Sequence, residues 1–347
     1  MEMQSEGFQF LENIATGAWF GEILFTAVEK ELFSFGQDKK TVLQYHCYLG
    51  FEESATYRYL LALEAMGLLR SDGETFQNTP LAQKYLVPQS EFYQGHSILW
   101  RRDLCRRWQN LSHGLAVGCR TDFPPDDDAA SIKRRFRQYS FAMNDIARCK
   151  AREVVARFPI AMEKARILDV GSGLAAISCE FLRIWPKSHA TLVDMRDVME
   201  LCEEELPIAL CQRIRLVDMN VLEPWGALKG ETFDLILLSN IIHAFDRRDN
   251  AALMQRVAKH LSSRGIVLIH DFFRGHYDPK AAALDLNMLL NTYNGRVFSF
   301  VEIHELMADN GLYHTELLPL PSDTALIVAA KQKEQLIPWE KKGGKPL

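Results

Sequence analysis

The part of this sequence best suited to chemistry is a glycine turn surrounded by carboxylates. The segment Asp169-Val-Gly171-Ser-Gly173 ends a short apolar run. Gly171 and Gly173 can adopt backbone angles that other residues avoid, and they let a ligand approach the main chain closely. Two further acids, Asp194 and Asp218, each end another apolar run. Because strand, glycine turn and helix start together bind nucleotide-like ligands, we expect such a ligand here.

Two cofactor classes fit this turn. The pattern Gly171-Ser-Gly173-Leu-Ala-Ala176, followed by Asp194, matches the fingerprint of a dinucleotide site. A site for S-adenosylmethionine (SAM) differs by a carboxylate just before the glycines, and Asp169 is such a carboxylate. Acids at three successive strand ends favour SAM, which offers an amino group, a ribose diol and an adenine but no pyrophosphate. An NAD-dependent oxidoreductase is the alternative.

A histidine follows another apolar strand. His243 comes directly after the run 235–242, at the edge where parallel sheets bind ligands. A phenol has a pKa of about 10 and an imidazole about 6.5, so His243 could accept a proton as a hydroxyl oxygen attacks a methyl group. Such general base catalysis contributes roughly 10²–10⁴ in rate. The alternative is a strand-end histidine that only packs. His270 and Asp271 should face opposite sides of their strand, and we assign His270 a structural role.

Alternating strands and helices position these residues. From residue 165 onward the pattern predicts a parallel, doubly wound α/β sheet. The last two strands are joined by a short connection, which is unusual for a dinucleotide domain. The predicted strands are 166–170, 190–193, 213–218, 233–239, 265–270, 313–318 and 324–330, and the predicted helices are 175–185, 195–204, 249–262, 280–292 and 301–310.

The first hundred residues predict a second, mainly helical domain. Residues 8–34 are apolar on more than one helical face, which favours packing against a partner subunit. Residues 38–86 are typical of a winged helix-turn-helix, with few positive side chains beyond Arg58 and Arg70. Because DNA binding requires phosphate neutralisation, we favour a structural or dimerisation use of this module. A SAM-binding winged-helix regulator without catalysis is the alternative.

The bulk composition limits partners and location. A chain of 347 residues with a net charge of −5 has room for two domains and gives no electrostatic reason to expect nucleic acid or a membrane surface. No apolar run is long enough to span a bilayer. Seven cysteines without a Cys-x-x-Cys pair indicate reduced thiols, so we expect a cytoplasmic protein. We predict no bound metal.

Taken in order, the motifs resemble those of the SAM-dependent small-molecule O-methyltransferases of plants and bacteria. The similarity covers about residues 8–332. It rests on Leu60-Leu-Ala-Leu, Thr79-Pro-Leu-Ala, Phe141-Ala-Met-Asn-Asp, Ile167-Leu-Asp-Val-Gly-Ser-Gly, Val193-Asp-Met, Val217-Asp-Met, Leu238-Ser-Asn-Ile-Ile-His243, Asp271 and Glu302. The resemblance implies a Rossmann-like class I methyltransferase sheet with a terminal antiparallel strand, preceded by a winged-helix dimerisation domain.

The resemblance also implies roles for individual residues. SAM would be the cofactor and S-adenosylhomocysteine (SAH) the product. Asp194 would hold the ribose hydroxyls, and Asp218 and Met219 would frame the adenine. His243 would be the general base, with Glu302, Asp271 and Asp246 as possible acids beside it. The expected cofactor-binding set is Asp169, Gly171, Gly173, Asp194, Met195, Asp218, Met219, Ser239 and Phe245.

The expected reaction is methyl transfer to a hydroxyl of an aromatic or heteroaromatic small molecule. C- or N-methylation of a larger ring system by the same fold is the alternative. The acceptor pocket would be apolar and aromatic, and the protein a homodimer through its N-terminal domain. The expected substrate-binding residues are Trp100, Met143, Asn144, Met288 and Asn291. The expected segments are a winged-helix domain (1–110), connecting helices (111–160), a SAM-binding domain (161–332) and a mobile tail (333–347).

Overall fold

The computed structural model describes residues 7–120, 128–162 and 164–340. The chain forms two compact units, Met1–Arg106 with Phe141–Ile146, and Arg107–Ser140 with Ala147–Leu347. The segment 111–160, expected to connect two domains, is therefore divided between both units. Among the described ranges, no helix has the length and apolar character needed to cross a membrane.

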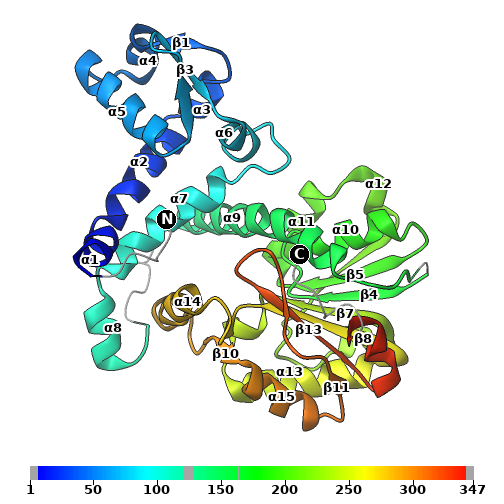
Figure 1. The fold of residues 1–347 in the computed structure, drawn as a ribbon. Helices are drawn as coiled ribbons and strands as arrows, with labels where there is room; N and C mark the ends of the chain where they lie inside the picture. Colours follow the sequence, from blue (N-terminus) through cyan, green and yellow to red (C-terminus); the bar gives the residue numbers. More distant parts are fainter. Residues whose placement is uncertain (1–6, 121–127, 163, 341–347) are drawn as a thin grey trace. The chain divides into compact units, whose positions relative to one another are not determined.

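The first unit combines helices with a small antiparallel sheet of order β1-β3-β2 (Figure 1). Thr41 and Gln44 form a capping box that starts α4, and Gly50 ends that helix with φ 68°. The helices are α1 (Phe8–Ala15), α2 (Gly17–Glu29), α3 (Leu32–Phe35), α4 (Val42–Leu49), α5 (Glu53–Ala65), α6 (Pro80–Tyr85) and α7 (Gly95–Trp108), and the strands are β1 (Lys40–Thr41), β2 (Leu69–Ser71) and β3 (Thr75–Asn78). Its core gathers Phe33, Tyr45, Leu60, Leu63 and Phe76.

The second unit is built on an eight-stranded sheet of order β11-β13-β8-β7-β4-β5-β6, with β12 pairing β13. The strands β4, β5, β6, β7 and β8 run parallel, whereas β13 is antiparallel to β8. The predicted α/β class with a terminal antiparallel strand is confirmed. The strands are β4 (Arg166–Val170), β5 (His189–Asp194), β6 (Ile214–Asp218), β7 (Phe233–Ser239), β8 (Leu261–Asp271), β11 (Tyr313–His314), β12 (Leu318–Pro319) and β13 (Ala325–Ala330).

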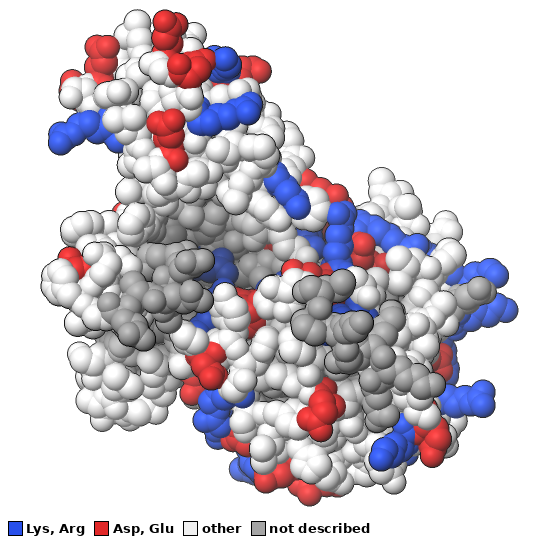
Figure 2. Space-filling view, in the orientation of Figure 1, with Lys and Arg blue, Asp and Glu red and all other residues white. Residues whose placement is uncertain are grey.

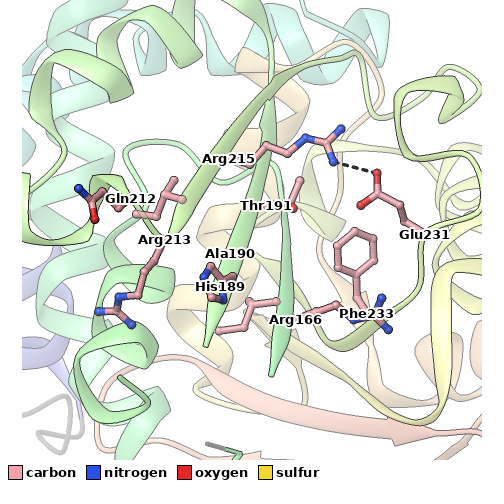
Figure 3. A pocket seen from close by; sticks show the side chains of 11 residues that line it. Arg166, His189, Ala190, Thr191, Gln212, Arg213, Arg215, Glu231 and Phe233 are labelled. Atoms are coloured by element: carbon pink, nitrogen blue, oxygen red, sulfur yellow. Dashed lines mark hydrogen bonds and ion pairs between the residues drawn. The ribbon is translucent and has the colours of Figure 1, made fainter. Parts of the chain in front are cut away.

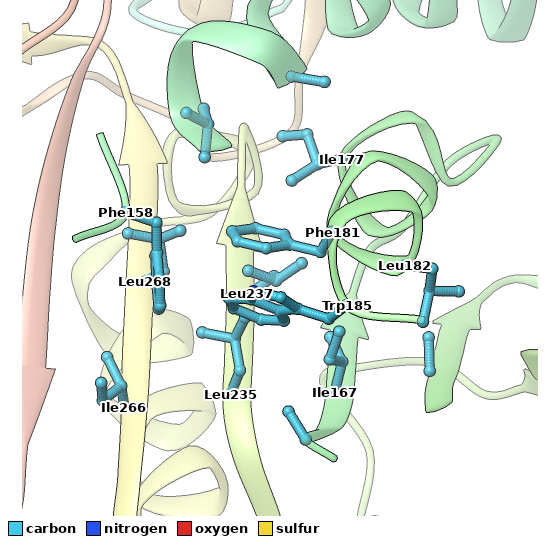
Figure 4. Close-up of a cluster of buried hydrophobic side chains, with 14 of the residues drawn as sticks. Phe158, Ile167, Ile177, Phe181, Leu182, Trp185, Leu235, Leu237, Ile266 and Leu268 are labelled. Atoms are coloured by element: carbon cyan, nitrogen blue, oxygen red, sulfur yellow. The ribbon is translucent and has the colours of Figure 1, made fainter. Parts of the chain in front are cut away.

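Helices cover both faces of this sheet (Figure 1). One face packs against α10 and α11 around Phe158, Phe181 and Trp185 (Figure 4). The other packs against α13 and α15. The remaining elements are α8 (Leu111–Val117), α9 (Ala129–Ala156), α10 (Ala176–Ile184), α11 (Arg196–Glu205), α12 (Ile208–Cys211), α13 (Arg247–His260), α14 (Asp278–Asn291), α15 (Phe300–Ala308), α16 (Ile337–Glu340), the 3₁₀ turns η1 (Gly226–Leu228), η2 (Ile242–Ala244) and η3 (Lys333–Leu336), and the parallel pair β9 (Phe273–Arg274) and β10 (Phe298–Ser299).

Two details near the C-terminus differ from expectation. The predicted strand 313–318 is split into β11 and β12, because the Thr315 hydroxyl rather than a backbone carbonyl accepts the Val328 amide at 3.2 Å. Residues 333–340, expected in a mobile tail, instead form η3 and α16. Leu336 and Trp339 are buried there in the core shared with Phe158, which explains the order. Residues 341–347 lie outside the described ranges.

Candidate active site

The glycine turn after β4 is closed on one side and open on the other. Gly171 and Gly173 have φ values of 68° and 53°, which side chains rarely tolerate. A Cβ on Gly171 would lie 2.6 Å from Ile241 Cδ1, whereas a Cβ on Gly173 would meet no described atom within 4 Å. The turn is therefore packed by the protein at Gly171 and accessible to a ligand at Gly173.

The carboxylate of Asp169 is buried at the end of β4. The Ser178 hydroxyl donates a hydrogen bond of 2.6 Å to Asp169 Oδ2. Burial raises the pKa of Asp169 to about 7, with Ser178 acting against the shift and the nearby Asp194 adding to it. A nearby positive charge would stabilise the ionised form of this buried carboxylate. The ammonium group of a ligand could supply that charge.

Asp194 and Asp218 lie next to each other at the ends of β5 and β6. Asp194 accepts the backbone N–H groups of Gly173 at 3.0 Å and Met195 at 2.8 Å. Burial raises the pKa of Asp194. Asp218 is exposed and pairs with Arg196 Nε at 3.0 Å. The residues that the sequence predicts for SAM thus converge on one edge of the sheet.

A buried hydroxyl at this edge supports the fit of a polar cofactor. In the described part of the chain, Ser172 Oγ is buried and has no hydrogen-bond partner. Because unsatisfied buried polar groups are costly, this hydroxyl would gain from a hydrogen bond to a polar ligand at the turn. With the open side of Gly173 and the carboxylates of Asp169 and Asp194 beside it, the turn fits SAM.

His243 lies in η2, just beyond the end of β7, and forms a close pair with an acid. Its Nδ1 lies 2.5 Å from Asp271 Oδ1, with side-chain exposures of 16% for His243 and 2% for Asp271. The backbone N–H of His243 also donates to Asp271 Oδ2 at 3.3 Å. Since a carboxylate only accepts hydrogen bonds, Nδ1 carries the proton and Nε2 remains an acceptor.

Two residues without an apparent sequence signal hold the main chain around His243. Asn250 Nδ2 donates to the carbonyls of Ile242 at 2.9 Å, Phe245 and Asp246. Gly295 packs so closely that an added Cβ would lie 2.5 Å from the His243 carbonyl oxygen. Neither position belongs to a motif, so only the tertiary structure could reveal them.

The other candidate acids have different partners. Glu302 forms the capping box of α15 with Ser299 and pairs with Arg296 at 2.8 Å. Asp246 caps α13 by accepting the Asp249 amide at 2.9 Å. His270 is buried, and its ring bonds Ser239 and Thr324 while Asp271 bonds His243, as alternation along the strand predicts. Of the three acids, Asp271 is the one that contacts His243.

The remaining predicted site residues are distributed over both units. Ser239 ends β7 and Phe245 packs against the core below η2. Asn291 accepts a hydrogen bond from Arg107 at 3.0 Å and donates to Asn287, so its amide already has protein partners. Trp100, Met143 and Asn144 belong to the first unit, whereas Met288 and Asn291 lie on α14 of the second. Their convergence on one acceptor pocket stays a prediction.

A hollow of about 260 Å³ lies at the opposite edge of the sheet, where β4, β5, β6 and β7 begin (Figure 3). Arginines line it, but each has partners within the chain. Arg215 pairs with Glu231 at 2.8 Å, and Arg213 donates to the Leu182 carbonyl at 3.0 Å. None of the residues that line this hollow belongs to the set predicted for methyl transfer, so the two places are separate.

Comparison with known proteins identifies the chain's family. Residues 120–313 match the O-methyltransferase domain family. The chain belongs to this family. It is 27% identical over 332 residues to 3-hydroxy-5-methyl-1-naphthoate 3-O-methyltransferase of Streptomyces sahachiroi, covering 93% of this chain and 94% of that protein. It is 24% identical over 342 residues to 3-amino-4-hydroxybenzoate 4-O-methyltransferase of Streptomyces cremeus, covering 93% and 90%.

The fold of this O-methyltransferase is also that of solved relatives. The crystal structure of human N-acetylserotonin methyltransferase in complex with SAM matches 96% of this chain and 100% of that chain, with a TM-score of 0.79 and 18% identity. The protein is accordingly a SAM-dependent O-methyltransferase, and the expected family and cofactor are confirmed.

Proposed function

We propose that this O-methyltransferase transfers the SAM methyl group to a hydroxyl of an aromatic or heteroaromatic small molecule, with His243 as the general base. The observation that carries the proposal is the 2.5 Å contact between His243 Nδ1 and Asp271 Oδ1 at the cofactor edge of the sheet. The two hydroxy-aromatic acids named for the Streptomyces relatives support the acceptor class.

Asp271 prepares His243 for proton transfer in two ways. It holds the imidazole through Nδ1, and it stabilises the imidazolium that forms when Nε2 takes a proton. SAM, when bound, supplies an electrophilic methyl group on a sulfonium. The phenol of an acceptor, with a pKa of about 10, loses its proton to His243 as its oxygen attacks, so a free phenolate is never required.

The cofactor would be held by the residues around the glycine turn. In this proposal Gly171 and Gly173 pass below the methionine part, and Asp169 receives its ammonium group. Asp194 takes the ribose hydroxyls, while Asp218 and Met219 frame the adenine. Met195, Ser239 and Phe245 complete the wall. The buried, unpartnered hydroxyl of Ser172 supports a polar ligand at this turn.

The acceptor would lie against an apolar and aromatic wall beyond His243. We place Met288 and Asn291 of α14, which belong to the same unit as His243, in that wall. Asn291 is its polar anchor. The side-chain oxygen of Asn291 already accepts a hydrogen bond from Arg107, so it can accept one more from a substrate.

We also propose that the protein is a homodimer through its N-terminal helices. Within α1 no side chain is buried, and Phe8 is 75% and Leu11 63% exposed. Trp19 on α2 is 68% exposed. A row of large apolar side chains on neighbouring helices is costly in water and favours a second copy of the same surface.

The winged module offers little support for DNA binding. Along α5, the exposed side chains include Tyr57 and Leu61 beside the single basic residue Arg58. On the face in Figure 2, acidic and basic side chains are interspersed over this module. A phosphate backbone needs a concentrated positive surface, so a dimerisation role is favoured.

The dimer is tested by replacing Leu11 with Glu and measuring mass by light scattering. A shift to monomer is expected, because burying a charge in the interface is costly. Ile208→Glu is the control, since Ile208 is 92% exposed in the second unit and should not change the mass. A monomeric wild-type protein would contradict the proposal.

The reaction is tested with labelled SAM and a panel of hydroxylated naphthoates, benzoates and indoles. The panel includes matched rings whose hydroxyl is already methylated or is replaced by an amino group. We expect label only in compounds with a free hydroxyl, recovered as the methyl ether. Labelled carbon or nitrogen on the ring would instead favour C- or N-methylation by the same fold. SAM binding without transfer to any compound would favour a regulator.

A further inference from the structure

A buried chain of hydrogen bonds runs from Ser239 at the cofactor edge of the sheet through His270 to Thr324, and the last two have no part in the mechanism above. Ser239 Oγ lies 2.8 Å from His270 Nδ1, and His270 Nε2 lies 2.9 Å from Thr324 Oγ1. His270 is 1% exposed and Thr324 is fully buried. Burial, together with the charge of Lys150, lowers the pKa of His270 to about 3, so its imidazole is neutral near pH 7.

A neutral imidazole offers one donor and one acceptor nitrogen, which gives this chain a direction. Asn240 Nδ2 donates to Ser239 Oγ at 3.5 Å, so the Ser239 hydroxyl proton is available for His270 Nδ1. The network thereby assigns the imidazole proton to Nε2, which donates to Thr324. Every polar atom of His270 then has one partner.

The Thr324 end of the chain is anchored firmly. Ser322 and Asp323 precede Thr324 in the connection between β12 and β13. Asp323 pairs with Lys150 at 2.6 Å and with Lys280, and the Ser322 amide donates to Glu153 at 3.0 Å. Helices α9 and α14 therefore fix the point from which His270 is held.

The Ser239 end lies in the segment that contacts the glycine turn. The backbone N–H of Asn240 donates to the backbone carbonyl of His270 at 2.8 Å. Asn240 has a left-handed φ of 52°. Asparagine tolerates that conformation better than other residues with a side chain, and the hydrogen bond to the His270 carbonyl holds it there. The next residue, Ile241, packs directly on Gly171. His270 thus holds the two residues that place Ile241 against the turn.

We propose that His270 is a positioning residue of the SAM site, which fixes the segment 239–241 as one wall of the cofactor turn. Asp271, the next residue of β8, faces the other side of the strand and fixes His243. The two neighbours have different contacts and hence different roles. His270 affects the affinity for the cofactor, and Asp271 affects proton transfer. This inference depends on SAM as the cofactor and not on the role of His243.

Two conservative substitutions separate positioning from general stability. An Asn amide can reach the place of the imidazole Nδ1 and keep the bond to Ser239. A Gln amide reaches the place of Nε2 and keeps the bond to Thr324. We expect His270→Asn to bind SAH within about threefold of wild type and His270→Gln to bind about tenfold more weakly, the order expected for one lost buried hydrogen bond. Calorimetry without any acceptor measures both dissociation constants.

A double-mutant cycle with Ser239→Ala provides the control. Ser239→Ala should weaken SAH binding, and combining it with His270→Gln should add little, because both changes break the same bond. Melting temperatures should fall similarly for the Asn and Gln variants. Equal SAH affinities for the two His270 variants, additive losses in the cycle, or wild-type affinity of Ser239→Ala would each overturn the proposal. If the His270 variants do not fold, Thr324→Val decides, because it removes the partner of His270 Nε2 without changing a residue of the cofactor wall. Wild-type SAH affinity of Thr324→Val would then overturn the proposal.

Discussion

The two edges of the central sheet both gather charged side chains, but in different states. At the amino edge, Arg215 pairs with Glu231 beside the hollow of about 260 Å³, and both side chains are well exposed. At the carboxyl edge, Asp169 and Asp271 are almost fully buried. The amino edge thus has a hollow between exposed charges, whereas the carboxyl edge has buried carboxylates.

This difference shows that burial, rather than the presence of a hollow, marks the reactive edge. Exposed ion pairs such as Arg215–Glu231 contribute only about 0–1 kcal/mol each, because water solvates both charges. Burial instead raises the pKa of Asp169 to about 7 and also raises the pKa of Asp194. Perturbed pKa values cluster at functional sites for this physical reason.

The largest expected effect at the carboxyl edge comes from Asp271→Asn. The amide cannot stabilise an imidazolium, so kcat should fall by roughly 10²-fold or more. SAH binding should change little, because Asp271 contacts His243 and not the glycine turn. Steady-state kinetics and calorimetry measure the two quantities. A kcat close to wild type would mean that Asp271 does not assist the base.

Gly171→Ala should weaken SAH binding by about tenfold or more, since the left-handed backbone is strained and the new methyl group displaces Ile241. Gly230→Ala is the matched control. Gly230 also has positive φ, 81°, but no described atom lies within 4 Å of an added Cβ. It should lower the melting temperature without affecting SAH binding. Equal losses of SAH affinity in both variants would indicate that strain alone, and not contact with Ile241, matters.

The raised pKa of Asp169 predicts a pH-dependent stability of the ligand-free protein. Unfolding lowers this pKa from about 7 to its usual 3.8, so the folded state binds the extra proton between these values. The contribution of Asp169 to stability is full below pH 3.8 and is lost as pH rises through 7. Asp169→Asn has no such titration. Its melting temperature relative to wild type should therefore rise by a few degrees between pH 5 and pH 8, at roughly 2–4 °C per kcal/mol. A constant difference would contradict the assignment.

The smallest effect is expected at the amino edge. Arg215→Gln breaks the pair with Glu231 and removes one positive charge from the hollow. Neither kcat nor the KM for SAM should change by more than about twofold, because exposed pairs contribute little. A large loss of activity would overturn the comparison between the two edges and would make the hollow part of the site.

Much of the fold could be predicted because its strands carry local patterns. The apolar runs ending at Asp169, Asp194 and Asp218 predict three neighbouring strand ends, and β4, β5 and β6 pair as expected. Parallel strands place such acids at a common edge. The pattern at 313–318 failed because the Thr315 hydroxyl takes over a ladder bond from the backbone, which periodicity cannot reveal.

The details of the site depend on contacts between residues far apart in sequence. The sequence offers three acids as partners of His243, and the pairing of β7 with β8 brings Asp271 to it. Asn250 and Gly295 support the same turn from a helix and a loop that no motif includes. Asn250 acts through hydrogen bonds to three backbone carbonyls, and Gly295 acts because a side chain would not fit beside the His243 carbonyl. Both effects depend on the tertiary structure, so the sequence alone does not predict them.

The role of His243 as the general base is tested most directly by the turnover of His243→Ala, measured beside its SAH affinity. We predict a fall in kcat of about 10²–10⁴-fold with SAH binding within about twofold of wild type. His304→Ala, which changes an exposed histidine on α15, should leave both quantities unchanged. A His243→Ala enzyme that still turns over within a few-fold of wild type would show that the hydroxyl loses its proton elsewhere.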